Sequence, residues 1–404
     1  MNKHILVISQ YFYPEQFRIN DICTEWVKRG YRVTVITGIP NYPEGKYYNG
    51  FGLFKKRKEK YKGIEIIRMP LIPRGSNTIM LALNYLSFVV SGYFWKVFTK
   101  IKADFVFIFE VSPMTQALPG VWYAKKMKIP CYLYVTDLWP ENVEIVAGVT
   151  NKRILNTIGH MVDYIYKKCD KIFTSSESFI QAIINRGTES NKLEFWPQYA
   201  EDYYQPIERF SVDVLEIPQD GIFNIIFTGN IGYAQGLDIL PKVVKILMED
   251  NIRIRFNIVG DGRFNETLKS IVEKNMISDY FNFVDKQPPT RIPELLAVCD
   301  AAFLSLADNL LFDMTIPAKL QSYMACGIAI IASASGETAK IINESKAGFC
   351  SKTGNAEALA NNIIKLSMLT KEELMQLGAN ARAYYEIYFN KDTLLDKMDK
   401  YFID

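Results

Sequence analysis

The sequence contains few residues suited to binding metal ions. Its 404 residues include two histidines and six cysteines, and no cysteine belongs to a CxxC motif. This composition excludes the usual zinc-binding and disulfide frameworks. We therefore expect no metal cofactor and a reducing, cytoplasmic environment. The cysteines are Cys23, Cys131, Cys169, Cys299, Cys326 and Cys350.

Two common N-terminal signatures are also missing. Residues 4–9 already have the pattern of a strand, so we expect no signal peptide. No GxGxxG follows a strand in the first half of the chain, although this motif marks nicotinamide and flavin dinucleotide sites. A dehydrogenase is therefore disfavoured.

Acidic residues are under-represented in the first half. Residues 1–200 contain 27 Lys and Arg against 16 Asp and Glu, and the remaining residues contain 20 against 28. The densest basic cluster is residues 55–62, with six cations in eight positions. A basic half indicates an anionic membrane surface or a phosphorylated lipid as partner, although the cluster could equally be a solvated loop. We expect no nucleic-acid partner, because no recognised nucleic-acid-binding module accompanies the cluster.

One long apolar run needs its own interpretation. Residues 79–98 are mostly apolar but include Asn84, Ser87, Ser91 and Lys96. The run could be a buried crossover helix, a helix in the membrane interface or a true transmembrane span. A span is disfavoured, because it would divide a sheet-forming domain between two compartments.

Strands alternate with helices along both halves, which predicts an α/β fold with doubly wound parallel sheets. The length indicates two domains. Three prolines and little periodicity suggest a linker at residues 196–221, between a first domain at 1–195 and a second at 222–388. In the first half we expect strands at residues 5–9, 32–37, 64–69, 105–109, 131–135 and 171–175, and helices at 20–29, 115–126 and 152–167.

The most informative segment is residues 223–238, a buried strand followed by a glycine turn. Gly229, Asn230 and Gly232 place backbone N–H groups where an anion can approach them. A similar turn follows the next strand, at residues 260–262. Pro317 opens a later helix that carries Lys319 in its first turn. We expect the Gly229 turn and the Lys319 helix to converge on one diphosphate.

The loops after the strands of the first half are rich in aromatic, carboxylate and amide groups. They occupy residues 10–18, 38–45 and 136–141. Such groups suit polyhydroxylated ligands, because rings pack on sugar C–H faces and polar groups bond hydroxyls. Ordinary loop packing is the alternative, and Asp137 could serve only as a helix cap. The candidate acceptor-binding residues are Tyr11, Tyr13, Glu15, Arg18, Asn41, Tyr42, Trp139 and Glu141.

Taken together, these motifs give the chain a family resemblance. Residues 10–15, 137–141, 228–232, 259–262 and 323–327 resemble the corresponding segments of family 4 retaining glycosyltransferases. The chain is especially similar to the bacterial O-antigen and capsular polysaccharide branch, which includes fucosamine transferases. The resemblance implies a GT-B fold, in which two facing Rossmann-like domains enclose an interdomain cleft. It also implies that residues 389–404 form a C-terminal helix crossing back to the N-terminal domain.

The sequence departs from the family at several positions. The second glutamate of the family's usual Glu-x7-Glu pair is replaced by Ser322, and the first position holds Met314, beside Asp313. The basic residue usually found in the first phosphate loop is Gln235. Lys319 therefore remains the main candidate cation, with Arg263 as a weaker one. We interpret the site as variant rather than inactive.

The resemblance implies transfer of a sugar from a UDP-type nucleotide-sugar to a polyprenyl-diphosphate-linked saccharide in surface polysaccharide (lipopolysaccharide or capsule) synthesis, peripherally at the inner face of the cytoplasmic membrane. An N-acetylated deoxyamino sugar is one candidate. A nucleotide-sugar 2-epimerase and a noncatalytic nucleotide-sugar-binding partner of a polysaccharide assembly complex are the alternatives. The expected catalytic residues are Asp137, Asp313 and Lys319, and the expected donor-binding residues are Gly229, Asn230, Gly232, Gly260, Asp261, Gly262, Arg263, Lys286, Pro317, Lys319 and Ser322.

Overall fold

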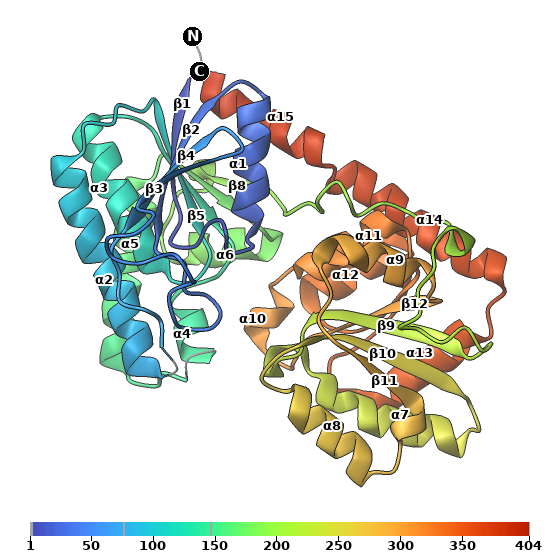
Figure 1. The fold of residues 1–404 in the computed structure, drawn as a ribbon. Helices are drawn as coiled ribbons and strands as arrows, with labels where there is room; N and C mark the ends of the chain where they lie inside the picture. The colour runs from blue at the N-terminus through green and yellow to red at the C-terminus, as the bar shows by residue number, and fades with distance from the viewer. Residues whose placement is uncertain (1–2, 76, 146–147, 404) are drawn as a thin grey trace. The chain divides into compact units, whose positions relative to one another are not determined.

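The computed structural model describes residues 3–75, 77–145 and 148–403. The chain divides into two compact units, each built on its own sheet (Figure 1). The first unit comprises residues 1–196 and 398–404, and the second comprises residues 197–397. Residues 1–2, 76, 146–147 and 404, which belong to the predicted N-terminal domain and C-terminal helix, lie outside the description.

The first unit contains an eight-stranded sheet in the order β3-β4-β2-β1-β5-β6-β7-β8. Every neighbouring pair is parallel except β3 and β4. The strands are β1 (His4–Ile8), β2 (Arg32–Gly38), β3 (Lys58–Tyr61), β4 (Ile64–Met69), β5 (Phe105–Glu110), β6 (Cys131–Val135), β7 (Lys171–Thr174) and β8 (Leu193–Phe195). The helices are α1 (Arg18–Lys28), α2 (Thr78–Phe98), α3 (Ala117–Met127), α4 (Glu141–Ile145), α5 (Lys152–Lys168) and α6 (Glu177–Asn185).

The central strands of this sheet follow directly from their composition. All five residues of β1 and all six of β5 are buried, as expected for continuous apolar runs covered on both faces. The predicted strands and helices of the first half are present, with boundaries that differ by one or two residues. The doubly wound parallel sheet is therefore confirmed.

The basic cluster at residues 55–62 is not simply a solvated loop. Its second half forms β3, an edge strand antiparallel to β4. Lysines at alternate positions keep this edge charged, which discourages pairing with a strand of another molecule. Alternating charged residues without apolar ones gave no strand signal in the sequence, so β3 was not predicted.

The second unit contains a six-stranded, fully parallel sheet in the order β11-β10-β9-β12-β13-β14. Its strands are β9 (Phe223–Asn230), β10 (Ile254–Asp261), β11 (Phe281–Val284), β12 (Ala301–Ser305), β13 (Ile330–Ser333) and β14 (Gly348–Ser351). Its helices are α7 (Leu240–Glu249), α8 (Asn265–Lys274), α9 (Ile292–Ala297), α10 (Leu310–Asp313), α11 (Ala318–Cys326), α12 (Gly336–Ser345), α13 (Ala356–Ser367) and α14 (Lys371–Tyr388). The last helix, α15 (Lys391–Ile403), begins in this unit and ends in the first.

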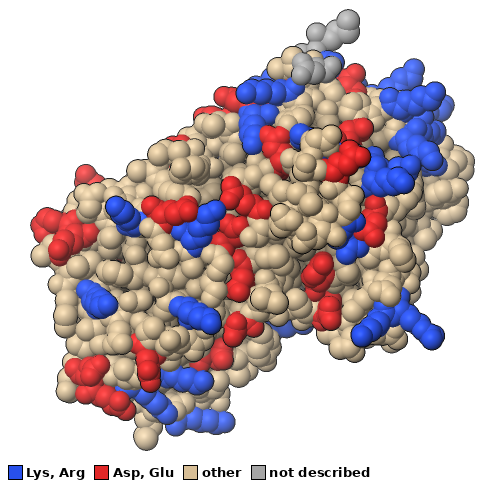
Figure 2. Space-filling model, turned by 180° about the vertical axis from the view of Figure 1, so that it is seen from behind, with Lys and Arg blue, Asp and Glu red and all other residues tan. Residues whose placement is uncertain are grey.

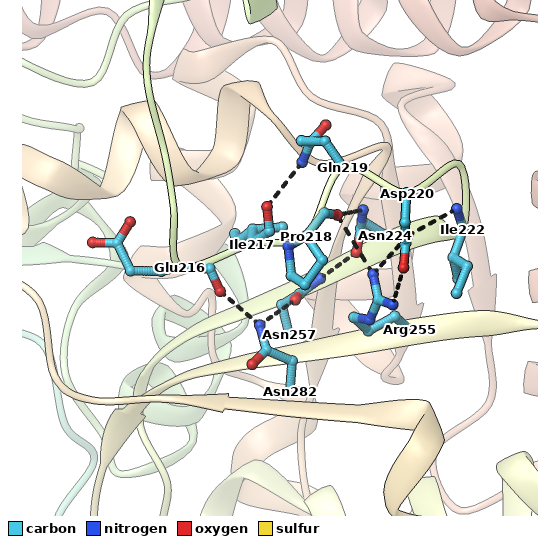
Figure 3. Close-up of polar contacts among 10 residues, drawn as sticks. All are labelled: Glu216, Ile217, Pro218, Gln219, Asp220, Ile222, Asn224, Arg255, Asn257 and Asn282. Carbon is cyan, nitrogen blue, oxygen red and sulfur yellow. Dashed lines mark hydrogen bonds and ion pairs between the residues drawn. The ribbon is translucent and has the colours of Figure 1, made fainter.

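The segment predicted as a linker, residues 196–221, is largely fixed to the second unit. Three asparagines on neighbouring strands form a ladder, in which Asn282 Nδ2 donates to Asn257 Oδ1 and Asn257 Nδ2 donates to Asn224 Oδ1, each at 2.9 Å (Figure 3). Asn282 also donates to the Glu216 carbonyl at 2.8 Å, and Asn224 donates to the Pro218 carbonyl at 3.0 Å. These bonds hold the end of the segment against the sheet, so it does not act as a free tether.

An ion pair secures the same segment. Both terminal nitrogens of Arg255, on β10, bind the carboxylate of Asp220, at 3.0 and 2.6 Å (Figure 3). The Arg255 guanidinium lowers the pKa of Asp220 to about 2. The contact therefore persists across the physiological pH range.

The end of α15 completes the core of the first unit. Phe402 is 0% exposed, and its ring centroid lies 5.2 Å from that of Trp26 and 5.4 Å from that of Phe105. Asp399, one turn earlier, pairs with Arg29 at 2.7 Å. The helix expected at residues 389–404 is present, and its last turn packs on α1 and β5.

Replacing Phe402 with Ala should lower the free energy of unfolding of the first unit by about 3–5 kcal/mol, because a buried aromatic side chain leaves a cavity. Urea unfolding followed by tryptophan fluorescence measures this change. The adjacent Ile403 is 69% exposed, so Ile403→Ala is a matched control expected to change stability by less than about 0.5 kcal/mol. Equal effects of the two variants would show that α15 is not docked in this core.

Candidate functional site

The glycine turn after β9 is shaped by a close approach of two strands. Gly229 on β9 is opposite Gly260 on β10 in the parallel register. A Cβ at position 260 would lie 1.9 Å from the Gly229 carbonyl oxygen, which no side chain could tolerate. Gly262 is similarly tight, because its Cβ would lie 2.3 Å from the Ile231 carbonyl oxygen. These two predicted donor-binding glycines are therefore required by packing around the turn, whatever they bind.

Gln235 closes the turn from within the protein. Its side-chain oxygen accepts hydrogen bonds from the Gly232 backbone N–H at 3.0 Å and from the Asn230 side chain at 3.3 Å. The Gly232 N–H, which the sequence offered as a phosphate donor, therefore already has a partner. Gln235 stands where the sequence resemblance implies a basic residue, and here a neutral amide stabilises the loop.

Lys319 lies directly beside Gly229. A Cβ at Gly229, which has φ +115°, would be 2.9 Å from Lys319 Cε and 3.6 Å from Nζ. Lys319 belongs to the first turn of α11, whose N-cap is Pro317 and whose C-cap is Gly327 at φ +66°. The helix predicted from Pro317 and Gly327 is therefore confirmed, and the Gly229 turn and the start of this helix do converge.

The environment of Lys319 is apolar. Its Nζ lies 3.7 Å from the centroid of the Phe227 ring, and burial lowers the pKa of the amine to about 7. No carboxylate among the described residues forms an ion pair with it. A desolvated cation held by a ring alone gains strongly from an incoming anion, because the anion supplies the missing charge partner.

The other residues expected at the donor site lie around the same sheet, and several have partners of their own. Asp313 ends α10, and its backbone packs against Gly336 at the start of α12; burial and the nearby Asp308 raise the pKa of its carboxyl. Ser322 donates to the Ala318 carbonyl of its own helix at 3.1 Å. Asp261 is exposed and accepts from the Gly262 N–H at 2.7 Å, while Arg263 and Lys286 are exposed after β10 and β11.

In the first unit, Glu15 joins two of the expected acceptor loops. The carboxylate, 2% exposed, accepts backbone N–H groups of Asn41 at 2.8 Å and Tyr42 at 2.7 Å, and of Phe12 at 3.4 Å. Burial raises the pKa of Glu15 to about 7, against the opposing effect of these donors. The structure therefore gives Glu15 a role in holding residues 10–18 to residues 38–45.

Several further acceptor candidates are also packed inside the unit. Tyr11 is 1% exposed, Asn41 is 0% exposed and Trp139 is 6% exposed. Trp139 donates through Nε1 to the Ser112 hydroxyl at 3.0 Å, and Asn41 Oδ1 accepts from the Arg74 backbone at 2.9 Å. The rings of Tyr11 and Trp139 and the amide of Asn41 pack between the loops, so they do not offer an open face to a ligand.

The more accessible candidates are Tyr13, Arg18, Tyr42 and Glu141. Tyr42 is 37% exposed, while Tyr13 is half-buried and stacks on Tyr61 with ring centroids 3.7 Å apart. Arg18 and Glu141 are half-buried at the starts of α1 and α4. The polar groups of Arg18 and Glu141 and the ring of Tyr42 are therefore at least partly accessible at the carboxyl-terminal edge of the sheet.

Two residues that were not predicted as site residues stand at this edge. Arg74 lies over the Tyr42 ring, with its guanidinium carbon 5.2 Å from the ring centroid, and reaches the Tyr11 hydroxyl at 3.4 Å. No ion pair joins Arg74 to a carboxylate in the part of the chain that the structure describes. The loop position of Arg74 before an apolar helix gave no motif, so only the fold reveals that it faces the tyrosines.

Glu110 is the other missed residue. It ends β5, is 0% exposed, and accepts from the Asp137 backbone at 3.4 Å. Burial and the nearby Asp137 carboxylate raise the pKa of Glu110 well above its usual range. Asp137 itself accepts from the Ser112 N–H at 2.8 Å. A polar residue at the carboxyl end of an apolar strand was a readable signal for Glu110.

Comparison with known proteins shows which family and which relatives this chain is similar to. Residues 214–384 match the protein family described as Glycosyl transferases group 1. WcaI of Escherichia coli K12, named as a colanic acid biosynthesis glycosyl transferase, is 25% identical over 410 residues that cover 97% of this chain and 97% of WcaI.

Solved structures extend the similarity to the whole fold. Sucrose-phosphate synthase from Thermosynechococcus elongatus superposes with a TM-score of 0.75 at 16% identity, covering 99% of this chain and 98% of that one. Anabaena HepE in complex with UDP and glucose superposes with a TM-score of 0.70 at 14% identity, covering 99% of each chain. The comparisons support a glycosyltransferase with the two-domain GT-B fold, in which residues 214–384 are similar to the Glycosyl transferases group 1 family.

Proposed function

We propose that the protein transfers a sugar from a UDP-type nucleotide-sugar to a lipid-linked saccharide during synthesis of a bacterial surface polysaccharide. The stereochemistry is retaining, as in family 4, and a fucosamine-type sugar is a candidate donor group. The similarity to WcaI supports the polysaccharide assignment, and the complex of HepE with UDP supports the nucleotide.

The assignment of the donor site depends on a single observation, which is the proximity of Lys319 to Gly229. It combines an apolar-buried amine, a backbone turn without a Cβ and the N-terminus of a nine-residue helix in one place. Each of these favours an anion, and together they suit a diphosphate. In this proposal the second unit holds the donor.

The chemistry needs charge stabilisation more than a protein nucleophile. When the bond between the anomeric carbon and the diphosphate breaks, negative charge develops on the leaving phosphate. Lys319 and the helix N-terminus stabilise that charge with fixed dipoles and a fixed cation, so little reorganisation is needed during the reaction. The acceptor hydroxyl attacks the face from which the diphosphate leaves, and its proton passes to the leaving phosphate. No metal is required in this scheme.

The first unit supplies the acceptor side. Arg74 presents a guanidinium without a carboxylate partner among the described residues, next to Tyr42, and the charges of both Arg74 and Asp137 act on the nearby Tyr85. A guanidinium suits the phosphates of a polyprenyl-diphosphate acceptor. Asp137 would orient the attacking hydroxyl, while Asp313 would approach the donor sugar or ribose.

Replacing Lys319 with Ala should weaken nucleotide-sugar binding about 10- to 100-fold, because it removes a charge-assisted hydrogen bond to phosphate. Isothermal titration calorimetry with the nucleotide-sugar that gives the largest thermal shift in a screen measures the change. Lys365 is exposed on α13, so Lys365→Ala is the matched control and should bind normally. Normal affinity and turnover in Lys319→Ala would refute the donor site.

Donor affinity should be constant below pH 7 and should fall as the pH rises above 7. The free amine of Lys319 has a pKa of about 7, and the diphosphate binds its protonated form, so the complex takes up a proton at higher pH. The phosphates of a nucleotide-sugar are both esterified and do not titrate near this pH. Calorimetry at pH 8 in buffers of different ionisation enthalpy should show uptake of close to one proton per donor, and Lys319→Ala should show none.

Replacing Arg74 with Gln should raise the KM for a polyprenyl-diphosphate-linked acceptor about tenfold or more while leaving donor affinity unchanged, because a phosphate contact is lost. Arg74→Lys should recover part of the loss. Arg153→Gln, at an exposed position on α5, is the control. Initial-rate assays with varied acceptor measure these values. A rise in the KM for donor instead would place Arg74 outside the acceptor site.

Nucleotide-sugar binding without transfer to any lipid-linked acceptor would favour the noncatalytic alternative. Conversion of the donor sugar in the absence of acceptor would favour the epimerase. Both outcomes are separate from the Lys319 test, because they concern turnover by the unaltered protein.

A further inference from the structure

Helix α2 exposes a continuous apolar stripe. Among the described residues it is the one helix long and apolar enough to cross a membrane, yet only 17% of its apolar window is buried. Of the three alternatives for residues 79–98, the structure does not support a mostly buried crossover helix. The stripe, called here the α2 apolar face, consists of Ile79 (74% exposed), Leu83 (39%), Leu86 (58%), Val90 (47%), Phe94 (56%) and Val97 (43%).

The spacing of these six residues follows the helical period. Successive members are three or four positions apart, so they lie on one side of α2 along its 21 residues. A helix of this length extends for about 30 Å. The surface is therefore an elongated strip and not a set of scattered apolar side chains.

The polar residues of α2 face the opposite way, into the first unit. Asn84 Nδ2 donates to the Ile72 carbonyl at 2.6 Å, and Asn84 Oδ1 accepts from Gln10 Nε2 at 2.7 Å. Ser87 accepts from the Ile72 backbone at 2.9 Å, and Ser91 donates to the Pro70 carbonyl. This is the reverse of the usual surface helix, which turns its polar side outward to water. Asn84, Ser87 and Ser91, which weakened a membrane assignment in the sequence, thus form hydrogen bonds inside the protein.

The charge around α2 complements an anionic surface. Residues 71–103 contain four Lys and Arg and no Asp or Glu. Near the end of α2, Lys126 of α3 donates to the Lys96 and Val97 carbonyls at 2.8 and 3.0 Å. Figure 2 shows Lys and Arg gathered at the upper right edge, where Figure 1, seen from the opposite side, draws α2 and α3.

Aromatic side chains gather at the same end of the helix. Tyr93 packs edge to face on Trp122 with centroids 5.8 Å apart, and Trp95 lies 5.2 Å from Tyr123. Tyr93 and Phe98 are 48% and 75% exposed. Rings with cations beside them are typical of the boundary between lipid headgroups and acyl chains.

The fold excludes a transmembrane span. Helix α2 connects β4 to β5, and both strands belong to the same parallel sheet. Its inner side packs on α3 closely enough that a Cβ at Gly92 would lie 2.2 Å from Pro119 Cγ. The helix could cross a bilayer only if it left this sheet.

From the outward apolar face and its cationic surroundings we infer that α2 lies in the plane of an anionic membrane, with the α2 apolar face in the headgroup and upper acyl region. The lysines around its C-terminal end contact anionic lipid headgroups. A second copy of the chain is the other possible occupant of this face, and the association state of the protein in solution tests for it. The inference does not depend on glycosyl transfer.

Replacing Leu86, Val90 and Phe94 together with Ser should reduce binding to anionic vesicles on the order of 100-fold, because three side chains no longer enter the apolar region. Sedimentation of the full chain with vesicles of equal phosphatidylglycerol and phosphatidylcholine content measures this partitioning. The unaltered protein should bind phosphatidylcholine vesicles far more weakly, and its binding to the anionic vesicles should weaken with salt. Thermal unfolding confirms that the variant is folded.

The matched control replaces Leu215, Met276 and Ile387 with Ser, since these apolar residues of the second unit are 87%, 87% and 67% exposed. This control should sediment like the unaltered protein. Equal binding by both triple variants, or no binding by the unaltered protein, would overturn the inference. So would a concentration-dependent dimer in analytical ultracentrifugation that only the α2 variant loses, because the face would then bind a second copy.

Discussion

The approach of β9 to β10 at Gly229 and Gly260 is the constraint on which the candidate donor site depends. Without a Cβ at position 260, the two backbones pair in register to the ends of their strands. The chain then turns over Ile231 and leaves room beside Gly229 for the Lys319 side chain. The positive charge and the backbone turn thus meet because position 229 lacks a Cβ, which would lie 2.9 Å from Lys319 Cε, and not because the segments are near in sequence.

The sequence was sufficient for the parallel α/β arrangement, for the central strands of the sheets and for this convergence. Continuous apolar runs such as β1 and β5 identify strands buried on both faces, and Pro317 with Gly327 marks both ends of α11. It was insufficient where charged residues form an edge strand, as in β3, and where the role of a residue depends on its contacts in the folded protein. Gln235 illustrates the second case, since composition showed a missing cation but not that its amide would hold the turn.

The same limit applies to α2 and to the first-unit loops. Composition counts apolar and polar residues in α2, but only the structure shows that Asn84 and Ser91 turn inward and Leu86 turns outward. In the loops, residue types suited to sugars are mostly used to join loop to loop, as Glu15 does through three backbone N–H groups. Burial, which depends on the tertiary fold, decides between these uses.

Phe402 has a consequence for how the molecule is made. Synthesis proceeds from the N-terminus, so Trp26 and Phe105 leave the ribosome long before their packing partner on α15. Throughout translation of the second unit, the nascent N-terminal sheet lacks part of its aromatic interior. The first unit to emerge is therefore the last to be finished, and a truncated message yields an N-terminal product with an open hydrophobic gap that quality-control proteases can recognise.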